Sequence, residues 1–90
     1  MTVLVDPPLV ESRGRRWSHL VSDESLAELH AFAERVGLPA GAFDRDHYDV
    51  PGEWYDDLLA AGAVPVRPRE LVARLRAAGL RRPSGPDPAG

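Results

Sequence analysis

Proline and glycine divide this 90-residue chain into short segments, which limits the length of the helices and strands that the chain can form. Residues 2–6 (TVLVD) are apolar and β-branched, and Pro7 and Pro8 follow them with no amide hydrogen to continue a ladder. The pattern predicts a buried strand with Asp6 at its carboxyl end. Residues 9–16 have the composition of a turn.

Two further segments predict strands that place polar side chains on one face. Because side chains alternate along a strand, the segment WSHLV puts Trp17 and His19 on the same face. The segment HYDV likewise puts His47 and Asp49 together. Residues 63–66 (AVPV) predict a last short strand, and the proline inside it favours the edge of a sheet.

Apolar residues at helical spacing predict three helices between these strands. The first covers residues 22–36, with Ser25 and Glu28 as a capping box, and a glycine ends it. A second helix is expected over residues 51–61 and a third over residues 68–78, each beginning at a proline.

Alternation of short strands with helices predicts the α/β class. We expect a small two-layer or three-layer domain with a short parallel or mixed sheet and about three helices. The chain is long enough for one domain, which we place at residues 1–80. Residues 81–90 (RRPSGPDPAG) are rich in proline and glycine and predict a disordered tail.

Composition excludes several classes of function. The chain has no cysteine, which rules out disulfides and thiolate metal sites, and it has no apolar run near the length of a membrane span. Since a signal-peptide pattern is also missing, we expect a soluble, cytoplasmic protein that does not bind membranes. A net charge of −3 disfavours broad binding to duplex nucleic acid.

Several segments of the chain resemble a small prokaryotic and viral family of domains of unknown function. They are VLVD, WSHL, DHYDV and AGAV, and the resemblance extends over residues 2–80. It implies a single compact domain in a bacterial protein, and it assigns no catalytic role to any residue.

The candidate site is a set of histidines and aspartates near the strand ends, where ligands bind in open α/β sheets. Asp6, His19 and Asp49 lie at or near such ends, and His47 lies two positions before Asp49. Two imidazoles with one or two carboxylates would suit a borderline divalent metal ion. The spacing matches no known metal motif, so the identity of any metal cofactor stays open.

Other interpretations of the histidines remain. His19 or His47 could act without a metal as a general base that an aspartate orients. Each could instead be a partly buried imidazole, hydrogen-bonded to a carbonyl or carboxylate, that locks loops onto the sheet. His30 lies at the border of the first helix's apolar stripe, where capping the core is the favoured role.

Arg13, Arg15 and Arg16 stand beside Trp17, a combination that suits an anionic group joined to a flat ring. The alternative is a solvated surface with Trp17 in the core. Glycine-rich phosphate loops are missing from the sequence, which disfavours the standard modes of ATP, GTP and dinucleotide binding.

The acidic run in the middle of the chain predicts mostly a solvated face, because its spacing fails as a calcium loop. Its members are Asp44, Asp46, Asp49, Glu53, Asp56 and Asp57. Tyr48 and Trp54, which lie within this run, are expected in the core.

These observations predict a protein that binds a small anionic or nucleotide-like ligand in a His/Asp pocket, with hydrolysis or proton transfer as the accompanying chemistry. Whether it is an enzyme stays open. The competing hypothesis is a non-enzymatic interaction domain, which binds a protein partner or itself through the acidic helix faces and the basic C-terminal segment.

Overall fold

The structure, a computed structural model, describes residues 2–81. Its six strands form one mixed sheet. They are β1 (Val3–Val5), β2 (Val10–Ser12), β3 (Arg15–Ser22), β4 (Phe43–Asp44), β5 (His47–Pro51) and β6 (Val64–Pro65). None of the helices in the described part of the chain is long and apolar enough to cross a membrane.

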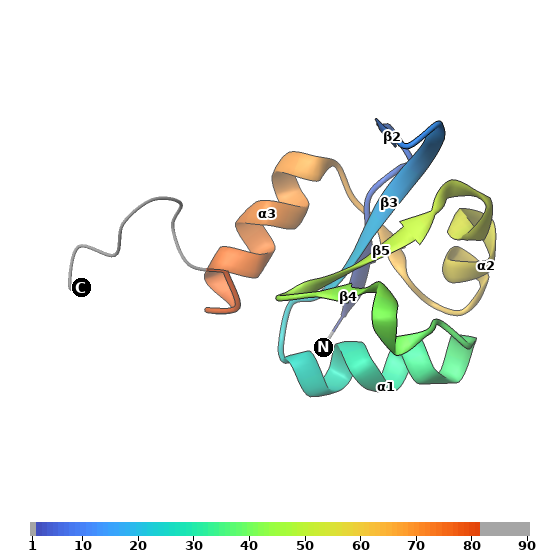
Figure 1. Cartoon of the computed structure of the whole chain (residues 1–90). Helices are drawn as coiled ribbons and strands as arrows, with labels where there is room; N and C mark the ends of the chain where they lie inside the picture. Colours follow the sequence, from blue (N-terminus) through green and yellow to red (C-terminus); the bar gives the residue numbers. More distant parts are fainter. Residues whose placement is uncertain (1, 82–90) are drawn as a thin grey trace.

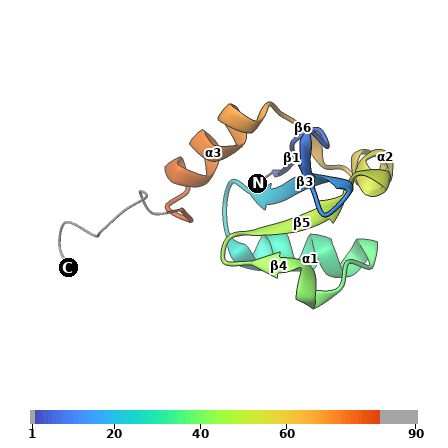
Figure 2. The ribbon, with the colours of Figure 1, turned by 45° about the horizontal axis from the view of Figure 1, so that its top comes forward.

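The long strand β3 organises the sheet. It pairs antiparallel with β1, β2 and β5, whereas β1 and β6 are parallel. The order is β4-β5-β3-β1-β6, as Figure 2 shows from bottom to top, with β2 paired to the first part of β3. The proline-containing strand β6 therefore lies at an edge, as predicted.

Helices cover both faces of this sheet (Figure 1). They are α1 (Leu26–Val36), α2 (Tyr55–Ala60) and α3 (Pro68–Ala77). Leu20 and Val50 pack with α1 and α2 on one face, while Leu4 and Val21 pack with α3 on the other. The result is a three-layer α/β domain with a mixed sheet and three α-helices within residues 2–81, which confirms the predicted fold class.

The first helix is shorter than predicted because its capping serine sets the start. Ser25 is in extended conformation, and its hydroxyl accepts a hydrogen bond from the Glu28 amide at 3.1 Å. Residues 22–25 therefore lie outside the helix. Gly37 ends it with a φ of 85°, a left-handed conformation that glycine adopts without steric cost.

Residues 9–16 are not a simple turn, since they form most of the hairpin between β2 and β3. Ser12 pairs with Arg15, so the connection has two residues, Arg13 and Gly14, with φ of 56° and 72°. Positive φ at both central residues is typical of the tight turns that suit the twist of hairpins. Arg15 and Arg16 consequently belong to β3.

The second helix starts later than predicted, whereas the third starts where it was expected. Pro51 closes β5, and the 3₁₀ turn Gly52–Trp54 precedes α2. The third helix begins at Pro68, as predicted. Arg81, which we expected in a disordered tail, is described and contacts Asp46, whereas residues 82–90 of that tail lie outside the described residues.

Candidate functional site

Two adjacent antiparallel strands bring His19, His47 and Asp49 together on the face that α3 covers only in part. His19 on β3 is paired with Asp49 on β5, and His47 shares the Asp49 face by strand alternation. The Asp49 Oδ1 atom lies 3.1 Å from His47 Nε2 and 3.8 Å from His19 Nε2. The three predicted catalytic residues are therefore neighbours.

A buried carboxylate fixes the His19 ring from behind. Asp6, which follows β1 and is 2% exposed, accepts a hydrogen bond from His19 Nδ1 at 2.9 Å through its Oδ2 atom. Its Oδ1 atom accepts from the His19 backbone amide at 2.6 Å. Asp6 thus orients His19, and because Nδ1 is occupied, Nε2 is the nitrogen that faces Asp49.

A second carboxylate holds His47 in the same way. Asp46 Oδ1 accepts a hydrogen bond from His47 Nδ1 at 2.7 Å. Arg81, just beyond α3, binds Asp46 with two nitrogens, at 2.8 and 2.9 Å. The His47 Nε2 atom is therefore also the free nitrogen of its ring, and it too faces Asp49.

Each imidazole has the second partner that metal-binding histidines commonly use to fix their tautomer. The three candidate ligand atoms, one from each of His19, His47 and Asp49, lie within 4.8 Å of one another. Neighbouring ligands around tetrahedral zinc are about 3.3 Å apart, given zinc–nitrogen distances of about 2.0–2.1 Å. Asp49 Oδ1 is already close to that separation from both imidazoles, at 3.1 and 3.8 Å. The remaining approach, of at most about 1.5 Å, is between the Nε2 atoms of His19 and His47.

The carboxylates also set the protonation behaviour of the cluster. The hydrogen bond to Asp6 raises the pKa of His19 above its ordinary value, against the opposing effect of burial. The hydrogen bonds from Arg81 and then from His47 lower the pKa of Asp46 to about 2. Asp46 is therefore ionised in the folded protein at neutral pH.

The Asp46–Arg81 pair predicts a dependence of stability on acid. A carboxyl group whose pKa is about 2 in the folded chain and 3.8 when unperturbed contributes about 2 kcal/mol above pH 4, which is lost as the pH falls toward 2. Arg81→Gln should lower the free energy of unfolding at pH 7 by about 1–2 kcal/mol. It should also flatten the loss of stability between pH 4 and pH 2, measured by urea unfolding.

The matched control is Arg76→Gln, because Arg76 is an exposed arginine of α3. This change should leave both the stability at pH 7 and its pH dependence close to those of the native chain. If Arg81→Gln and Arg76→Gln were equally stable at pH 7, Arg81 would not support Asp46.

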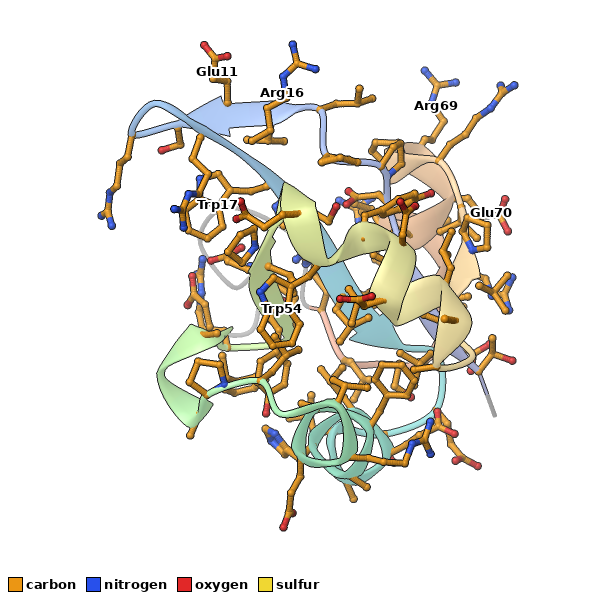
Figure 3. The ribbon with its side chains drawn as sticks, turned by 90° about the vertical axis from the view of Figure 1, so that its right-hand side faces the viewer. Glu11, Arg16, Trp17, Trp54, Arg69 and Glu70 are labelled. Carbon is orange, nitrogen blue, oxygen red and sulfur yellow. The ribbon has the colours of Figure 1, made fainter. Side chains whose placement is uncertain are left out.

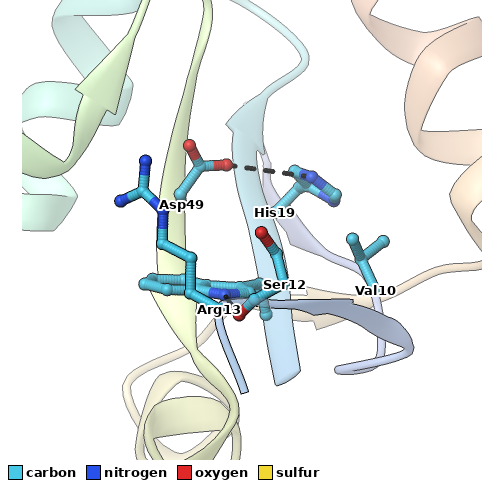
Figure 4. Close-up of a pocket in the computed structure, with 6 residues that line it drawn as sticks. Val10, Ser12, Arg13, His19 and Asp49 are labelled. Carbon is cyan, nitrogen blue, oxygen red and sulfur yellow. Dashed lines mark hydrogen bonds and ion pairs between the residues drawn. The ribbon is translucent and has the colours of Figure 1, made fainter. Parts of the chain in front are cut away.

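A cavity of about 300 Å³ opens beside the cluster (Figure 4). His19 and Asp49 line one side, and the hairpin supplies the other with Ser12, Arg13 and part of Trp17. Figure 4 shows His19 and Asp49 facing each other, with the Arg13 side chain extending from the hairpin on the Asp49 side. The cavity therefore combines imidazole, carboxylate and guanidinium groups.

The structure changes two details of the predicted site. His19 and Asp49 lie within their strands and are not at strand ends, because β3 and β5 are antiparallel and overlap at these residues. Of these three residues, Asp6 alone follows the carboxyl end of its strand, β1. Arg15 and Arg16 line a separate hollow with Glu53, so Arg13 is the arginine of this group that borders the cavity at His19.

Asp46 and Arg81 are the members of the cluster that the sequence did not indicate. The sequence predicts Asp46 on a solvated face, but the residue is only 8% exposed. The adjacent pair Asp46-His47 was the available signal, although neighbouring residues on a strand normally face opposite ways. Asp46 lies in the β4–β5 turn, where that rule fails. The third histidine, His30, instead contacts the Tyr48 hydroxyl at 2.7 Å at the edge of the core.

A known protein family matches most of the chain. The sequence model of a family described as "Protein of unknown function (DUF4031)" matches residues 3–78. This confirms the expected membership in a family of unknown function. Neither the curated proteins nor the solved structures gave a match.

Proposed function

The chain belongs to the DUF4031 family of proteins of unknown function, and we propose that it binds a divalent transition metal ion through His19, His47 and Asp49. The ion acts on a small anionic or nucleotide-like ligand in the adjoining cavity. The observation that carries this proposal is the direction of both imidazoles: each Nδ1 is bound to a carboxylate and each Nε2 is turned toward the same third carboxylate.

That arrangement needs a cation to be stable. A neutral histidine whose Nδ1 donates to a carboxylate has a lone pair on Nε2, and a carboxylate has only acceptors. The Nε2 lone pairs of His19 and His47 would therefore repel Asp49 unless a proton on each ring, or one metal ion between them, intervened. One divalent ion satisfies all three groups at once, and imidazole with carboxylate suits zinc, iron or manganese.

The cavity wall suits an anion next to such an ion. Arg13 offers forked donors for a phosphate or carboxylate, and Trp17 offers an apolar surface. We assign hydrolysis as the reaction: a metal ion held by His19, His47 and Asp49 would lower the pKa of a water molecule, whose proton would pass to solvent. The water oxygen would then form a bond to phosphorus as the bond from phosphorus to the leaving oxygen breaks. The leaving oxygen takes a proton from solvent. His19 and His47 are ligands in this scheme and do not act as bases.

A thermal-unfolding screen of the full chain tests the proposal. Zinc or manganese at about 100 times its dissociation constant should stabilise the protein by about 2.7 kcal/mol, or about 10–20 °C for a domain of this size. Magnesium should have a smaller effect, because it prefers oxygen ligands. In the presence of the preferred metal, phosphate release from nucleoside monophosphates tests the hydrolytic part.

The proposal fails if none of these metals raises the melting temperature. If a metal stabilised the protein but no phosphate were released, the metal site would be supported and the hydrolytic activity contradicted. In both assays a chelator should return the protein to its metal-free behaviour.

The non-enzymatic interaction domain makes a different prediction. Arg69 and Arg76 of α3 are exposed, as is the acidic first turn of α2, whereas Arg74 is paired with Asp23 at 2.7 Å within the chain. If oppositely charged faces pair between chains, size-exclusion chromatography at low salt should give a dimer that dissociates in high salt. Arg69→Glu with Arg76→Glu should then abolish it. A monomer at all salt concentrations would contradict self-association through these faces.

A further inference from the structure

A second cavity of about 450 Å³ adjoins the His/Asp cluster, and its walls are largely aromatic and apolar. Trp17, Phe43 and Trp54 line it, and it shares Arg13, Trp17 and Asp49 with the first cavity. We call it the ring cavity. Its volume lies within the about 300–1,000 Å³ that is typical of small-molecule sites.

The ring cavity exists because β4 is short. Phe43 and Asp44 pair with the first two residues of β5, and β4 then ends, so within residues 2–81 the rest of the β5 edge has no partner strand on that side. Another part of the wall comes from the segment around the 3₁₀ turn Ala40–Ala42, with Leu38, Pro39, Gly41 and Ala42 lining the cavity. Asp49 lies at the start of this free edge, which places the cavity directly beside the proposed metal ligand.

The aromatic walls are held in position by contacts outside the cavity. The Trp17 Nε1 atom donates a hydrogen bond to the Ser12 carbonyl at 3.0 Å. The Phe43 ring packs against His30 and Tyr48, with ring centroids 4.6 and 5.3 Å away. Figure 3 shows Trp17 and Trp54 on the same side of the molecule, Trp54 beside α2 and Trp17 on the hairpin side. Such fixed rings can accept a ligand with little loss of side-chain freedom.

We infer that the ring cavity holds a planar heterocycle whose attached phosphate lies at Arg13 and the metal, so that the ligand is a nucleoside monophosphate or a heteroaryl phosphate of similar size. The inference rests on the proposed function, because the metal ligand Asp49 joins the two cavities. A flat ring gains from aromatic walls, whereas a free sugar phosphate or inorganic phosphate would use only the first cavity. Stacking of one base on an aromatic side chain strengthens binding by about 5-fold to 150-fold.

Matched ligands separate the ring from the anion. With the zinc-loaded full chain, at a temperature low enough to prevent turnover, calorimetric titration should show that AMP binds at least about 10-fold more tightly than ribose 5-phosphate, with inorganic phosphate weaker still. Trp54→Leu should reduce the ratio of the AMP and ribose 5-phosphate affinities at least about 5-fold, because leucine keeps an apolar side chain at this position but has no π face. Trp54→Phe should restore most of that ratio, which a merely structural role for Trp54 would not explain.

A second variant isolates the anion contact. Arg13 has a φ of 56°, a conformation that asparagine tolerates, so Arg13→Asn removes the guanidinium while preserving the turn. It should weaken AMP, ribose 5-phosphate and inorganic phosphate by similar factors and leave the ratio of AMP to ribose 5-phosphate affinity unchanged.

Equal affinity of the native protein for AMP and ribose 5-phosphate would overturn the inference. So would a Trp54→Leu protein that folds and keeps the native ratio. If zinc still stabilises the protein, either result leaves the proposed metal site supported. If zinc does not stabilise the protein, the proposed function itself is contradicted. The two failures are therefore distinguishable.

Discussion

His47→Asn is expected to reduce zinc-induced stabilisation from about 10–20 °C to below about 2 °C. Asparagine can place its amide nitrogen near the position of His47 Nδ1 and keep a donor for Asp46, but it has no atom in place of Nε2. The change thus removes one metal ligand and preserves the local hydrogen bond. His19→Asn should have the same effect, because Asp6 then accepts from the amide in place of the ring.

The third histidine provides the control. His30 lies on α1 and bonds to Tyr48 on the opposite face of the sheet from His47, so His30→Asn should leave the zinc effect unchanged. Without zinc, His47→Asn and His19→Asn should melt within a few degrees of the native chain. If both variants failed to fold, the histidines would have a structural role, holding the loops on the sheet. If zinc stabilised both variants as strongly as the native chain, neither histidine would be a metal ligand.

Asp6→Asn is expected to weaken zinc binding by about 10-fold to 100-fold, the usual cost of losing a partner that orients a metal ligand. The asparagine oxygen can still accept from the His19 backbone amide, but the amide nitrogen then faces His19 Nδ1 as a donor. His19 must move its proton to Nε2 to accept that bond. The nitrogen that should bind the metal is thereby blocked.

Calorimetric titration of zinc measures this effect, with Asp57→Asn as the control because Asp57 is an exposed carboxylate on α2. Asp57→Asn should bind zinc like the native chain. An Asp6→Asn protein that is folded and binds zinc with native affinity would show that Asp6 is only a structural link between β1 and β3.

Local signals in the sequence were sufficient for most of the fold. The proline pair after β1, the serine cap of α1 and the proline start of α3 each act within a few residues, so their effects can be read without tertiary information. The hairpin escaped prediction because its turn requires an arginine at positive φ, which is uncommon outside glycine, asparagine and aspartate.

The site was predictable where strand alternation governs it. Period two placed His47 with Asp49 and Trp17 with His19, and pairing of β3 with β5 then joined the two sets. Sequence alone cannot supply that pairing, since it depends on which strands become neighbours. The contact of Asp46 with Arg81 could not be predicted for the same reason. The two residues are 35 positions apart in the sequence, and the path of α3 brings them together.

The location of a zinc ion in crystals of the protein tests the central claim most directly. Anomalous diffraction at the zinc edge should give a peak about 2.0–2.1 Å from the Nε2 atoms of His19 and His47 and about 2.0–2.2 Å from an Asp49 carboxylate oxygen. A folded protein whose zinc peak lies elsewhere, or whose imidazoles keep their distance from the ion, would contradict it.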